Sequence, residues 1–349
     1  MGLSPEYWRA VVRGEARGPG PALLRPLLWC ASKPYALGVR WRNRGFDRGR
    51  DVHWAGVPVI SIGNLTVGGT GKTPCVEYVA RLLRERDVRV AILSRGYGAE
   101  GGRNDEAMVL EENLTDVPHL QDRDRVAIAR TAVEELESEV LVLDDGFQHR
   151  RLARDVDIVL IDVTDPWGGG YLMPRGALRE PVSSLRRASL IVLTRCDAAD
   201  AEPVADAARG IAPGVPIART VHAPLELTNG PDQRSVNVLR GQTVGTFCGL
   251  GNPTAFRGTL NDLGANVVEF REYPDHHPYS RADVEGLERW ARNLPSDALV
   301  VTTQKDWVKL RTPTLGDRPL WALRIGLKFV EGRDAFDRAV LSVVPAAAE

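Results

Sequence analysis

From about residue 57 onward, the chain alternates between short apolar runs and longer amphipathic stretches. The apolar runs have the length of strands and end at glycine or polar residues; they are Val57–Ile62, Val88–Leu93, Val140–Leu143, Ile158–Asp162 and Leu190–Thr194. Helical stretches are predicted at about Thr73–Arg86 and Arg125–Glu137. Strands that alternate with helices are typical of a parallel sheet in an α/β fold.

A second α/β pattern follows a stretch rich in alanine, proline and polar residues at 200–235, which we interpret as a crossover between domains. Further strands are predicted at Thr243–Leu250, Asn266–Phe270 and Ala298–Thr302, and a helix at Pro253–Leu263. A chain of 349 residues is also long for a single core. We therefore predict three regions: an N-terminal helical region at 1–50, a main α/β domain at 51–220 and a smaller α/β domain at 221–349.

The N-terminal region has an unusual composition. Ala22–Val39 is mostly apolar, but charged residues and two prolines interrupt it, and it is shorter than the roughly 20 apolar residues of a membrane-spanning helix. Residues 1–53 carry ten Lys or Arg against four Asp or Glu. A basic, tryptophan-containing apolar segment favours a helix at a membrane interface with anionic lipids. The alternative is a helix docked on the protein's own surface.

The overall composition excludes several classes of function. The formal net charge is −1 and aromatic residues make up 6%, which argues against a nucleic-acid-binding protein. The four cysteines lie far apart and form no C-x-x-C pair, so neither a zinc site nor a disulfide framework is indicated. No secretory signal follows Met1.

A glycine-rich loop between a predicted strand and a predicted helix is the most informative motif. It comprises Thr66, Val67, Gly68, Gly69, Thr70, Gly71, Lys72 and Thr73. Backbone N–H groups of such a loop wrap phosphate oxygens, the lysine reaches the β- and γ-phosphates, and the last hydroxyl can bind Mg²⁺. Thr66 occupies the position of the first glycine in G-x-x-x-x-G-K-[ST], so the match is imperfect. The loop predicts a P-loop protein that binds ATP.

Two adjacent carboxylates follow the apolar run Val140–Leu143. Asp144 and Asp145 are thereby placed at the carboxyl end of a strand, where ligands bind in open α/β sheets. In P-loop enzymes such an aspartate holds Mg²⁺. Asp144 and Asp145 are both candidates, together with Thr73.

The motifs, taken in chain order, resemble those of the tetraacyldisaccharide 4′-kinases of the lipid A pathway. The resemblance covers about residues 20–330 and lies in the segments Gly63–Pro74, Ser94–Gly98, Asp144–His149, Leu172–Glu180, Gly249–Pro253 and Asp275–His277. That family's loop also lacks the first glycine. The G-D-E-P and T-E-K-D segments of the family read Asn104–Ala107 and Thr303–Asp306 here, and Gln304 replaces a glutamate.

The resemblance implies a fold and an activity. The fold would be a P-loop NTPase-like parallel sheet flanked by helices, with a second, smaller α/β domain and an N-terminal interfacial helix. The activity would be transfer of the γ-phosphoryl group of ATP, with Mg²⁺, to the 4′-hydroxyl of a tetraacyl-disaccharide 1-phosphate. Such a protein would be a monomer, peripheral or monotopic, at the cytoplasmic face of the bacterial inner membrane. Its partners would be the lipid A precursor and anionic lipids.

The resemblance also implies roles for particular residues. Asp105 would act on the sugar hydroxyl, Lys72 on the phosphates, and Asp145 would pair with His276 from the second domain. Substrate-binding positions would be Glu106, Arg125, Gln148, His149 and Glu180.

Two alternatives remain open at this point. One is a GTP-dependent switch or metallochaperone ATPase, because Thr194–Asp197 loosely matches a guanine-reading motif. The other is a soluble P-loop kinase or ligase for a small molecule, which the basic, apolar N-terminal region disfavours.

Overall fold

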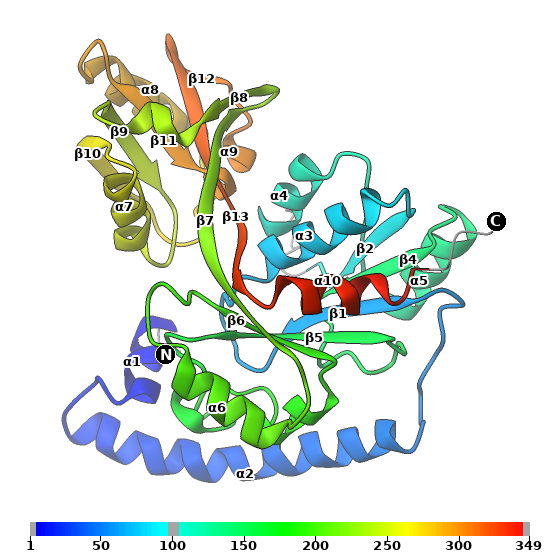
Figure 1. Ribbon diagram of the computed structural model, residues 1–349. Coiled ribbons are helices and arrows are strands. Elements are labelled where there is room, and N and C mark those ends of the chain that lie inside the picture. Colours follow the sequence, from blue (N-terminus) through cyan, green and yellow to red (C-terminus); the bar gives the residue numbers. More distant parts are fainter. Residues whose placement is uncertain (1–4, 97–104, 345–349) are drawn as a thin grey trace. The chain divides into compact units, whose positions relative to one another are not determined.

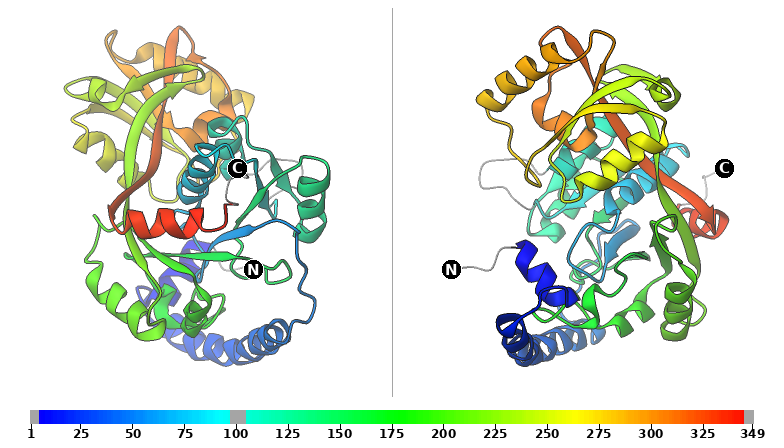
Figure 2. Two further views of the ribbon diagram at one scale, coloured as in Figure 1. Left: turned by 45° about the vertical axis from the view of Figure 1, so that its right-hand side comes forward. Right: turned by 90° about the vertical axis from the view of Figure 1, so that its left-hand side faces the viewer.

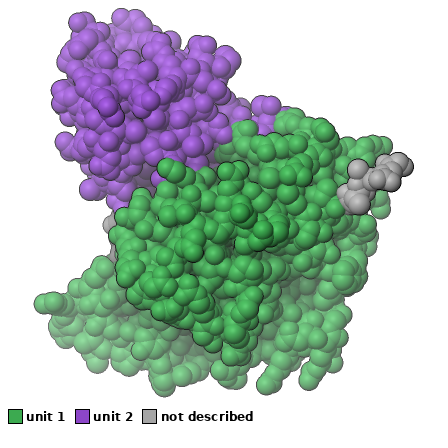
Figure 3. All heavy atoms as spheres, in the orientation of Figure 1, with its two compact units in different colours: residues 1–96, 116–221, 327–349 green, residues 97–115, 222–326 purple. Residues whose placement is uncertain are grey.

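The computed structural model describes residues 5–96 and 105–344, which fold into two compact units (Figure 3). Unit 1 comprises residues 1–96, 116–221 and 327–349, and unit 2 comprises residues 97–115 and 222–326. The predicted domain boundary after residue 220 lies one residue from the end of a unit 1 segment. The predicted contiguous division differs from these units, however, because residues 327–349 return to unit 1 and residues 97–115 belong to unit 2.

Unit 1 is built on a parallel sheet with the strand order β7-β6-β5-β1-β4-β2-β3. Its strands are β1 (Val59–Asn64), β2 (Val90–Ser94), β3 (His119–Gln121), β4 (Val140–Asp144), β5 (Val156–Asp162), β6 (Leu190–Thr194) and the first part of β7 (Ile217–Asn229). The strands β1 and β4 are neighbours in register, with Ile62 opposite Asp144. The glycine-rich loop after β1 and the two carboxylates after β4 therefore leave the sheet side by side.

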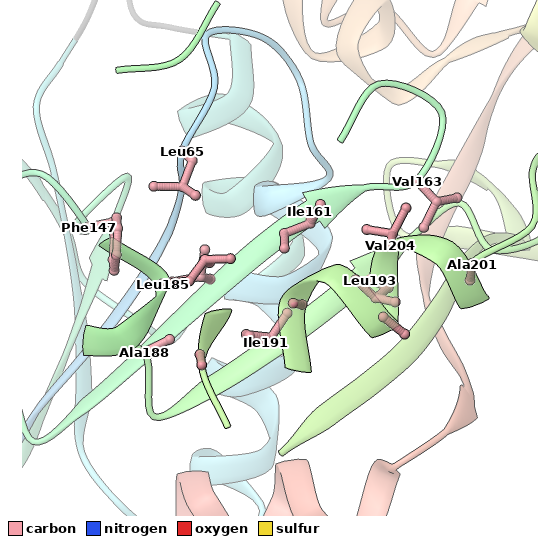
Figure 4. Packing of buried hydrophobic residues seen from close by; sticks show 14 of the residues in the cluster. Leu65, Phe147, Ile161, Val163, Leu185, Ala188, Ile191, Leu193, Ala201 and Val204 are labelled. Carbon is pink, nitrogen blue, oxygen red and sulfur yellow. The ribbon is translucent and has the colours of Figure 1, made fainter. Parts of the chain in front are cut away.

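Helices surround this sheet (Figures 1 and 2). They are α1 (Pro5–Arg13), α2 (Pro19–Asp47), α3 (Lys72–Arg84), α5 (Arg125–Glu134), α6 (Glu202–Ile211) and α10 (Arg333–Leu341), with short 3-10 turns η1 (Gly168–Gly170) and η2 (Val182–Arg187). One apolar cluster packs strands β5 and β6 against α6 and η2 and includes Leu65, Phe147 and Leu185 (Figure 4). Leu65, directly before the phosphate-loop segment, is thus anchored in this apolar cluster.

Unit 2 is a smaller α/β unit with the parallel strand order β10-β9-β11-β13. Its strands are β9 (Thr243–Cys248), β10 (Asn266–Glu272), β11 (Leu299–Thr303) and β13 (Arg318–Glu331), with antiparallel additions β8 (Asp232–Ser235) on β7 and β12 (Thr314–Leu315) on β13. Its helices are α4 (Asp105–Asn113), α7 (Pro253–Asp262), α8 (Arg281–Asn293), α9 (Gln304–Leu310) and the 3-10 turn η3 (Val236–Leu239). Aromatic packing of Phe247 with Tyr279 and Trp290 fills its core.

The predicted α/β class is confirmed, and the strand Leu190–Thr194 has the predicted bounds. The stretch 200–235, interpreted as a crossover between domains, contains α6, β7 and β8, and the chain passes from unit 1 to unit 2 within β7, after Val221. Strand β7 is half exposed along much of its length, so no apolar run marked it in the sequence.

Helix α2 is longer than its interrupted apolar run indicated. It continues for 29 residues through Pro26 and Pro34. Both prolines lie on an exposed part of the helix, where backbone carbonyls that lose a helical partner can be hydrated. Among the residues that the structure describes, no helix combines the length and the apolar character needed to span a bilayer.

Candidate active site

The glycine-rich loop lies where the sequence predicted it, between the end of β1 at Asn64 and the start of α3 at Lys72. Gly68 has φ 131° and Gly71 has φ 85°, which are backbone conformations that glycine adopts without strain. Helix α3 begins directly after Gly71, so the positive end of its dipole lies at the loop.

Side chains at the end of β6 hold the backbone of this loop. The Thr194 hydroxyl donates to the carbonyl of Thr70 at 3.0 Å, and the Arg195 guanidinium donates to the carbonyl of Gly69 at 3.2 Å. These residues belong to the segment that loosely matched a guanine-reading motif. In the structure these two side chains hydrogen-bond to the backbone of the phosphate loop.

Asp145 is surrounded by positively charged side chains of unit 1. Both of its carboxylate oxygens accept hydrogen bonds of 2.8 Å from the Arg179 guanidinium, and Lys72 Nζ lies 3.5 Å from Oδ1. Burial alone would raise the pKa of Asp145, but the hydrogen bonds and charge of Arg179, followed by the charges of Lys72 and Arg125, hold this pKa well below its usual range. Asp145 is thus ionised at any physiological pH.

The backbone of Asp145 is held in a left-handed conformation, with φ 52°. The Arg125 guanidinium donates to its carbonyl at 2.9 Å, and the N–H of Gly146 donates to the carbonyl of Ile62 at 2.9 Å. A Cβ at Gly146 would come within 2.5 Å of the Ser61 hydroxyl, so only glycine fits after Asp145. The loop after β4 is therefore fixed from several sides.

Two residues that the resemblance implied as substrate-binding are inside the protein. Arg125 is 3% exposed and contacts the loop of Asp145. Glu180 is 0% exposed, and its carboxylate accepts hydrogen bonds from Asn43 and Arg187. Burial and internal partners thus occupy both side chains in this structure, and their predicted contact with substrate stays a prediction.

Gln148 and His149 are partly exposed and follow the same loop. Gln148 Nε2 donates to the carbonyl of Asn64 at 2.9 Å. Burial, followed by the positive charges of Arg125 and Arg154, lowers the pKa of His149 to about 4, so this imidazole is neutral at pH 7. Their predicted contact with substrate stays a prediction.

In unit 2, Asp105 and His276 form a close pair. Nδ1 of His276 lies 2.8 Å from Oδ2 of Asp105, which is the first residue of α4. Burial would raise the pKa of Asp105, but the hydrogen bond from His276 and the charges of Lys305 and Lys309 outweigh burial, and this pKa is lowered. The same hydrogen bond raises the pKa of His276. Asp105 is therefore an ionised carboxylate that a histidine orients.

The segment Thr303–Asp306 packs directly beneath this pair. Lys305 Nζ lies 3.0 Å from Glu106 Oε1, so the predicted substrate-binding carboxylate of Glu106 is paired inside unit 2. Gln304 and Asn113 exchange two amide hydrogen bonds of 2.6 and 3.2 Å. Gln304 therefore joins α9 to α4 through both atoms of its amide group. A glutamate at this position could accept the hydrogen bond from Asn113 but could not donate one in return.

Some parts of the predicted site are outside what the structure tests. Tyr97, Gly98 and Asn104 lie outside the described residues. The predicted pair of Asp145 and His276 would join residues of different units, and it stays a prediction. Arg179 was not predicted as a site residue, although it stands next to Glu180 in the segment Leu172–Glu180. Its pairing with Asp145 depends on the fold, which brings these two residues together.

Comparison with known proteins bears on this geometry. The chain matches the family described as tetraacyldisaccharide-1-P 4′-kinase over residues 24–345. The chain belongs to this family. That match includes the phosphate loop, the loop of Asp145, Asp105 and His276.

Individual relatives agree along nearly their whole length. The tetraacyldisaccharide 4′-kinase of Anaeromyxobacter sp. (strain Fw109-5) is 42% identical over 344 residues, which cover 92% of each chain. That of Syntrophus aciditrophicus is 38% identical, covering 93% of this chain and 96% of the relative. The crystal structure of LpxK from Aquifex aeolicus in complex with ATP superposes with a TM-score of 0.76 at 32% identity, covering 92% of this chain and 99% of that one.

Proposed function

We propose that the protein transfers the γ-phosphoryl group of ATP to the 4′-hydroxyl of a tetraacyl-disaccharide 1-phosphate, a precursor of lipid A. The observation that carries the proposal is a glycine-rich phosphate loop that leads into Lys72 at the start of α3, in a chain that belongs to a kinase family over residues 24–345. The acceptor follows from the names of the relatives, and the donor from the ATP in the Aquifex aeolicus structure.

The phosphate loop binds and orients the donor. Backbone N–H groups from Gly68 to Gly71 and the N-terminus of α3 attract the triphosphate, and Lys72 moves from its place near Asp145 to the β- and γ-phosphates. In phosphoryl transfer the transition state is loose, so the protein contributes mainly position and charge.

The oxygen donors near the loop fit Mg²⁺. This ion prefers oxygen ligands, and in phosphate sites it takes one or two from carboxylates or hydroxyls of the protein. Asp145 directs both oxygens at Arg179, which favours Asp144, with the Thr73 hydroxyl, as the residues that hold the ion. Bound there, Mg²⁺ would neutralise charge on the transferred group.

Asp105 serves the acceptor side of the reaction. Its ionised carboxylate can accept the proton of the sugar hydroxyl, and His276 fixes the orientation of that carboxylate through Nδ1. For transfer to occur, Asp105 and the bound γ-phosphoryl group must act on the same hydroxyl.

The location that we propose is the cytoplasmic face of the inner membrane, and helix α2 supports it. One side of α2, its outer face, consists of Leu23, Leu27, Cys30, Pro34, Leu37 and Trp41, which recur at intervals of three or four and are all exposed. Trp41 is 79% exposed. An exposed apolar stripe on a basic helix is suited to the interface of an anionic bilayer.

Removing the outer face should weaken membrane binding. We expect the triple variant Leu27→Ser, Leu37→Ser, Trp41→Ser to lose at least tenfold in affinity for vesicles of phosphatidylglycerol and phosphatidylethanolamine, since each buried apolar side chain contributes about 1.5 kcal/mol or more. Co-sedimentation measures this affinity. Val238→Ser, a change at an exposed valine of unit 2, is the control. Equal sedimentation of both variants would contradict a membrane role for α2.

The decisive test of the activity is an assay of purified protein with γ-labelled ATP, Mg²⁺ and tetraacyl-disaccharide 1-phosphate in detergent micelles. We expect label in the lipid, and none when the 4′-hydroxyl is replaced by hydrogen. Hydrolysis of ATP without labelled lipid would refute the proposed acceptor. Equal use of GTP would favour the switch class instead.

The pH dependence of the reaction tests the pair of Asp105 and His276. Because the pKa of Asp105 is lowered, kcat/KM should fall only when the pH drops through that lowered value. His276→Ala removes the hydrogen bond that, with Lys305 and Lys309, opposes burial, so the pKa of Asp105 should rise and this acidic limb should move to higher pH. His277→Ala is the matched control, because the neighbouring His277 pairs with Asp283. An unmoved limb in His276→Ala would show that the histidine does not tune Asp105.

A further inference from the structure

The side of α2 opposite its outer face makes specific polar contacts with the segment that carries Arg179. The Tyr35 hydroxyl donates to the backbone carbonyl of Arg179 at 3.0 Å. Asn43 Nδ2 donates to Glu180 Oε2 at 3.0 Å, and Arg42 lies 3.4 Å from Glu180 Oε1. We call Tyr35, Arg42 and Asn43 the inner face of α2. Two consecutive residues, Arg179 and Glu180, are thus held by one helix.

The guanidinium of the same Arg179 lies at the nucleotide site. It binds both carboxylate oxygens of Asp145 and also donates to the backbone carbonyl and side chain of Asn64, the last residue of β1. Its backbone N–H donates to the carbonyl of Leu65 at 2.7 Å. Arg179 therefore connects the inner face of α2, through its carbonyl, with the start of the phosphate loop and with Asp145.

Glu180 also connects α2 to Phe147, through Arg187. This carboxylate is 0% exposed and accepts a hydrogen bond of 3.0 Å from Arg187, whose guanidinium stacks over the ring of Phe147 at 4.4 Å. Phe147 is fully buried, two residues after Asp145, and packs in the apolar cluster with Leu65 and Leu185 (Figure 4). A Cβ at Gly63 would lie 2.6 Å from Phe147 Cβ and 2.7 Å from its backbone nitrogen, so the backbone of Phe147 packs closely on β1.

A third contact joins α2 to the far end of the same loop. The Arg150 guanidinium donates to the carbonyl of Asn43 at 3.2 Å and to the Asp47 carboxylate at 2.8 Å. The loop that begins with Asp145 is consequently fixed to α2 at Arg150, and through Arg187 at Phe147.

We propose that α2 is a positioning element of the catalytic site: its inner face, acting through Glu180 and Arg179, sets the place of Asp145 and of the phosphate loop. This inference rests on the proposed function and assigns a second task to the helix whose outer face binds the membrane. Glu180 connects the inner face to Arg179, its neighbour in the chain, and to Arg187. A buried carboxylate that loses a donor must move towards its remaining partners or take in water, and either response displaces the adjacent Arg179.

A truncation of the N-terminal region would remove both faces of α2 at once. Removal of residues 1–45 deletes the outer face together with Tyr35, Arg42 and Asn43. Loss of activity after that truncation would therefore not distinguish membrane binding from positioning. Single substitutions on the inner face separate the two.

The test uses the full-length variants Asn43→Ala and Tyr35→Phe, with two readouts. We expect affinity for a non-hydrolysable ATP analogue with Mg²⁺, measured by calorimetry without lipid, to fall about tenfold in Asn43→Ala, as is usual when a supporting residue behind a metal and phosphate site is removed. In the lipid assay kcat should fall by a similar factor, while KM for the lipid stays within twofold. Tyr35→Phe should show a smaller change in the same direction.

Controls make the result specific. Gly38→Ala lies in the same helix, and its added Cβ meets nothing within 4 Å, so both readouts should equal those of the wild type. Exchanging the donor and acceptor in the double variant Asn43→Asp with Glu180→Gln should recover most of the analogue affinity that Asn43→Asp alone loses. Unchanged analogue affinity in folded Asn43→Ala would overturn the inference. Because calorimetry needs no lipid, this outcome is independent of whether the proposed acceptor is correct.

Discussion

Replacing Asp105 by asparagine should lower kcat for lipid phosphorylation by about a thousandfold, within the range for a lost general base. Affinity for ATP should change little, because in the proposed mechanism Asp105 acts on the acceptor hydroxyl and the phosphate loop binds the nucleotide. The reason lies in charge: His276, Lys305 and Lys309 keep the pKa of Asp105 low, so the native group is an ionised acceptor of protons. Asparagine keeps the shape and loses that capacity.

The chain offers a matched control for this substitution. Asp283 also pairs with a histidine in unit 2, His277, at 3.2 Å, and it caps α8. Asp283→Asn changes the same functional group in a similar pair and should retain kcat within twofold. If both variants lost activity equally, the defect would lie in the stability of unit 2 and not in proton transfer. Unfolding midpoints measured beside the rates distinguish these outcomes.

Lys72→Ala should reduce kcat/KM for ATP about a thousandfold, comparable to the loss of a main donor of charge stabilisation in other enzymes. Lys72 Nζ lies 3.5 Å from Asp145 in unit 1, and the transferred phosphoryl group would draw it away. The fold should persist, because Arg179 still neutralises Asp145 with two hydrogen bonds.

Single-turnover measurements at saturating ATP show whether this loss lies in binding or in chemistry. A large fall in the single-turnover rate would assign Lys72 to the transition state, and a change confined to KM would assign it to binding alone. Lys328→Ala, at an exposed lysine of unit 1, controls for the loss of a positive charge. A Lys72→Ala variant with normal rates would remove the P-loop from the proposed mechanism.

Local features of this site could be predicted from sequence, and pairings between distant segments could not. The strand, glycine turn and helix around Lys72 are contiguous, so their residues specify the structure by themselves. The pair of Asp145 and Arg179 joins residues 34 positions apart, and that of Asp105 and His276 joins residues 171 apart. Such contacts depend on sheet order and on packing, which a pattern of apolar residues leaves open.

Burial was the second property that sequence could not supply. Glu180 and Arg125 stand among residues of the site, and the sequence does not show how deeply their charged side chains are buried. Each has internal hydrogen-bond partners and is buried in unit 1, and its predicted contact with substrate stays a prediction. In helix α2 the prolines interrupted the apolar run of the sequence, but the helix continues through them at exposed positions.

The way the chain is divided between the units has a consequence for its synthesis. Helix α10 packs on α3, and Asp337 accepts a hydrogen bond of 2.8 Å from the Tyr78 hydroxyl (Figure 1). Phe336, which is fully buried, contacts the ring of Tyr78. A nascent chain on the ribosome has therefore made almost all of its residues before this part of unit 1 can close. Until then the side of α3 around Tyr78 that α10 covers is open to aggregation, so we expect expression of this protein to depend on chaperones and to improve at low temperature.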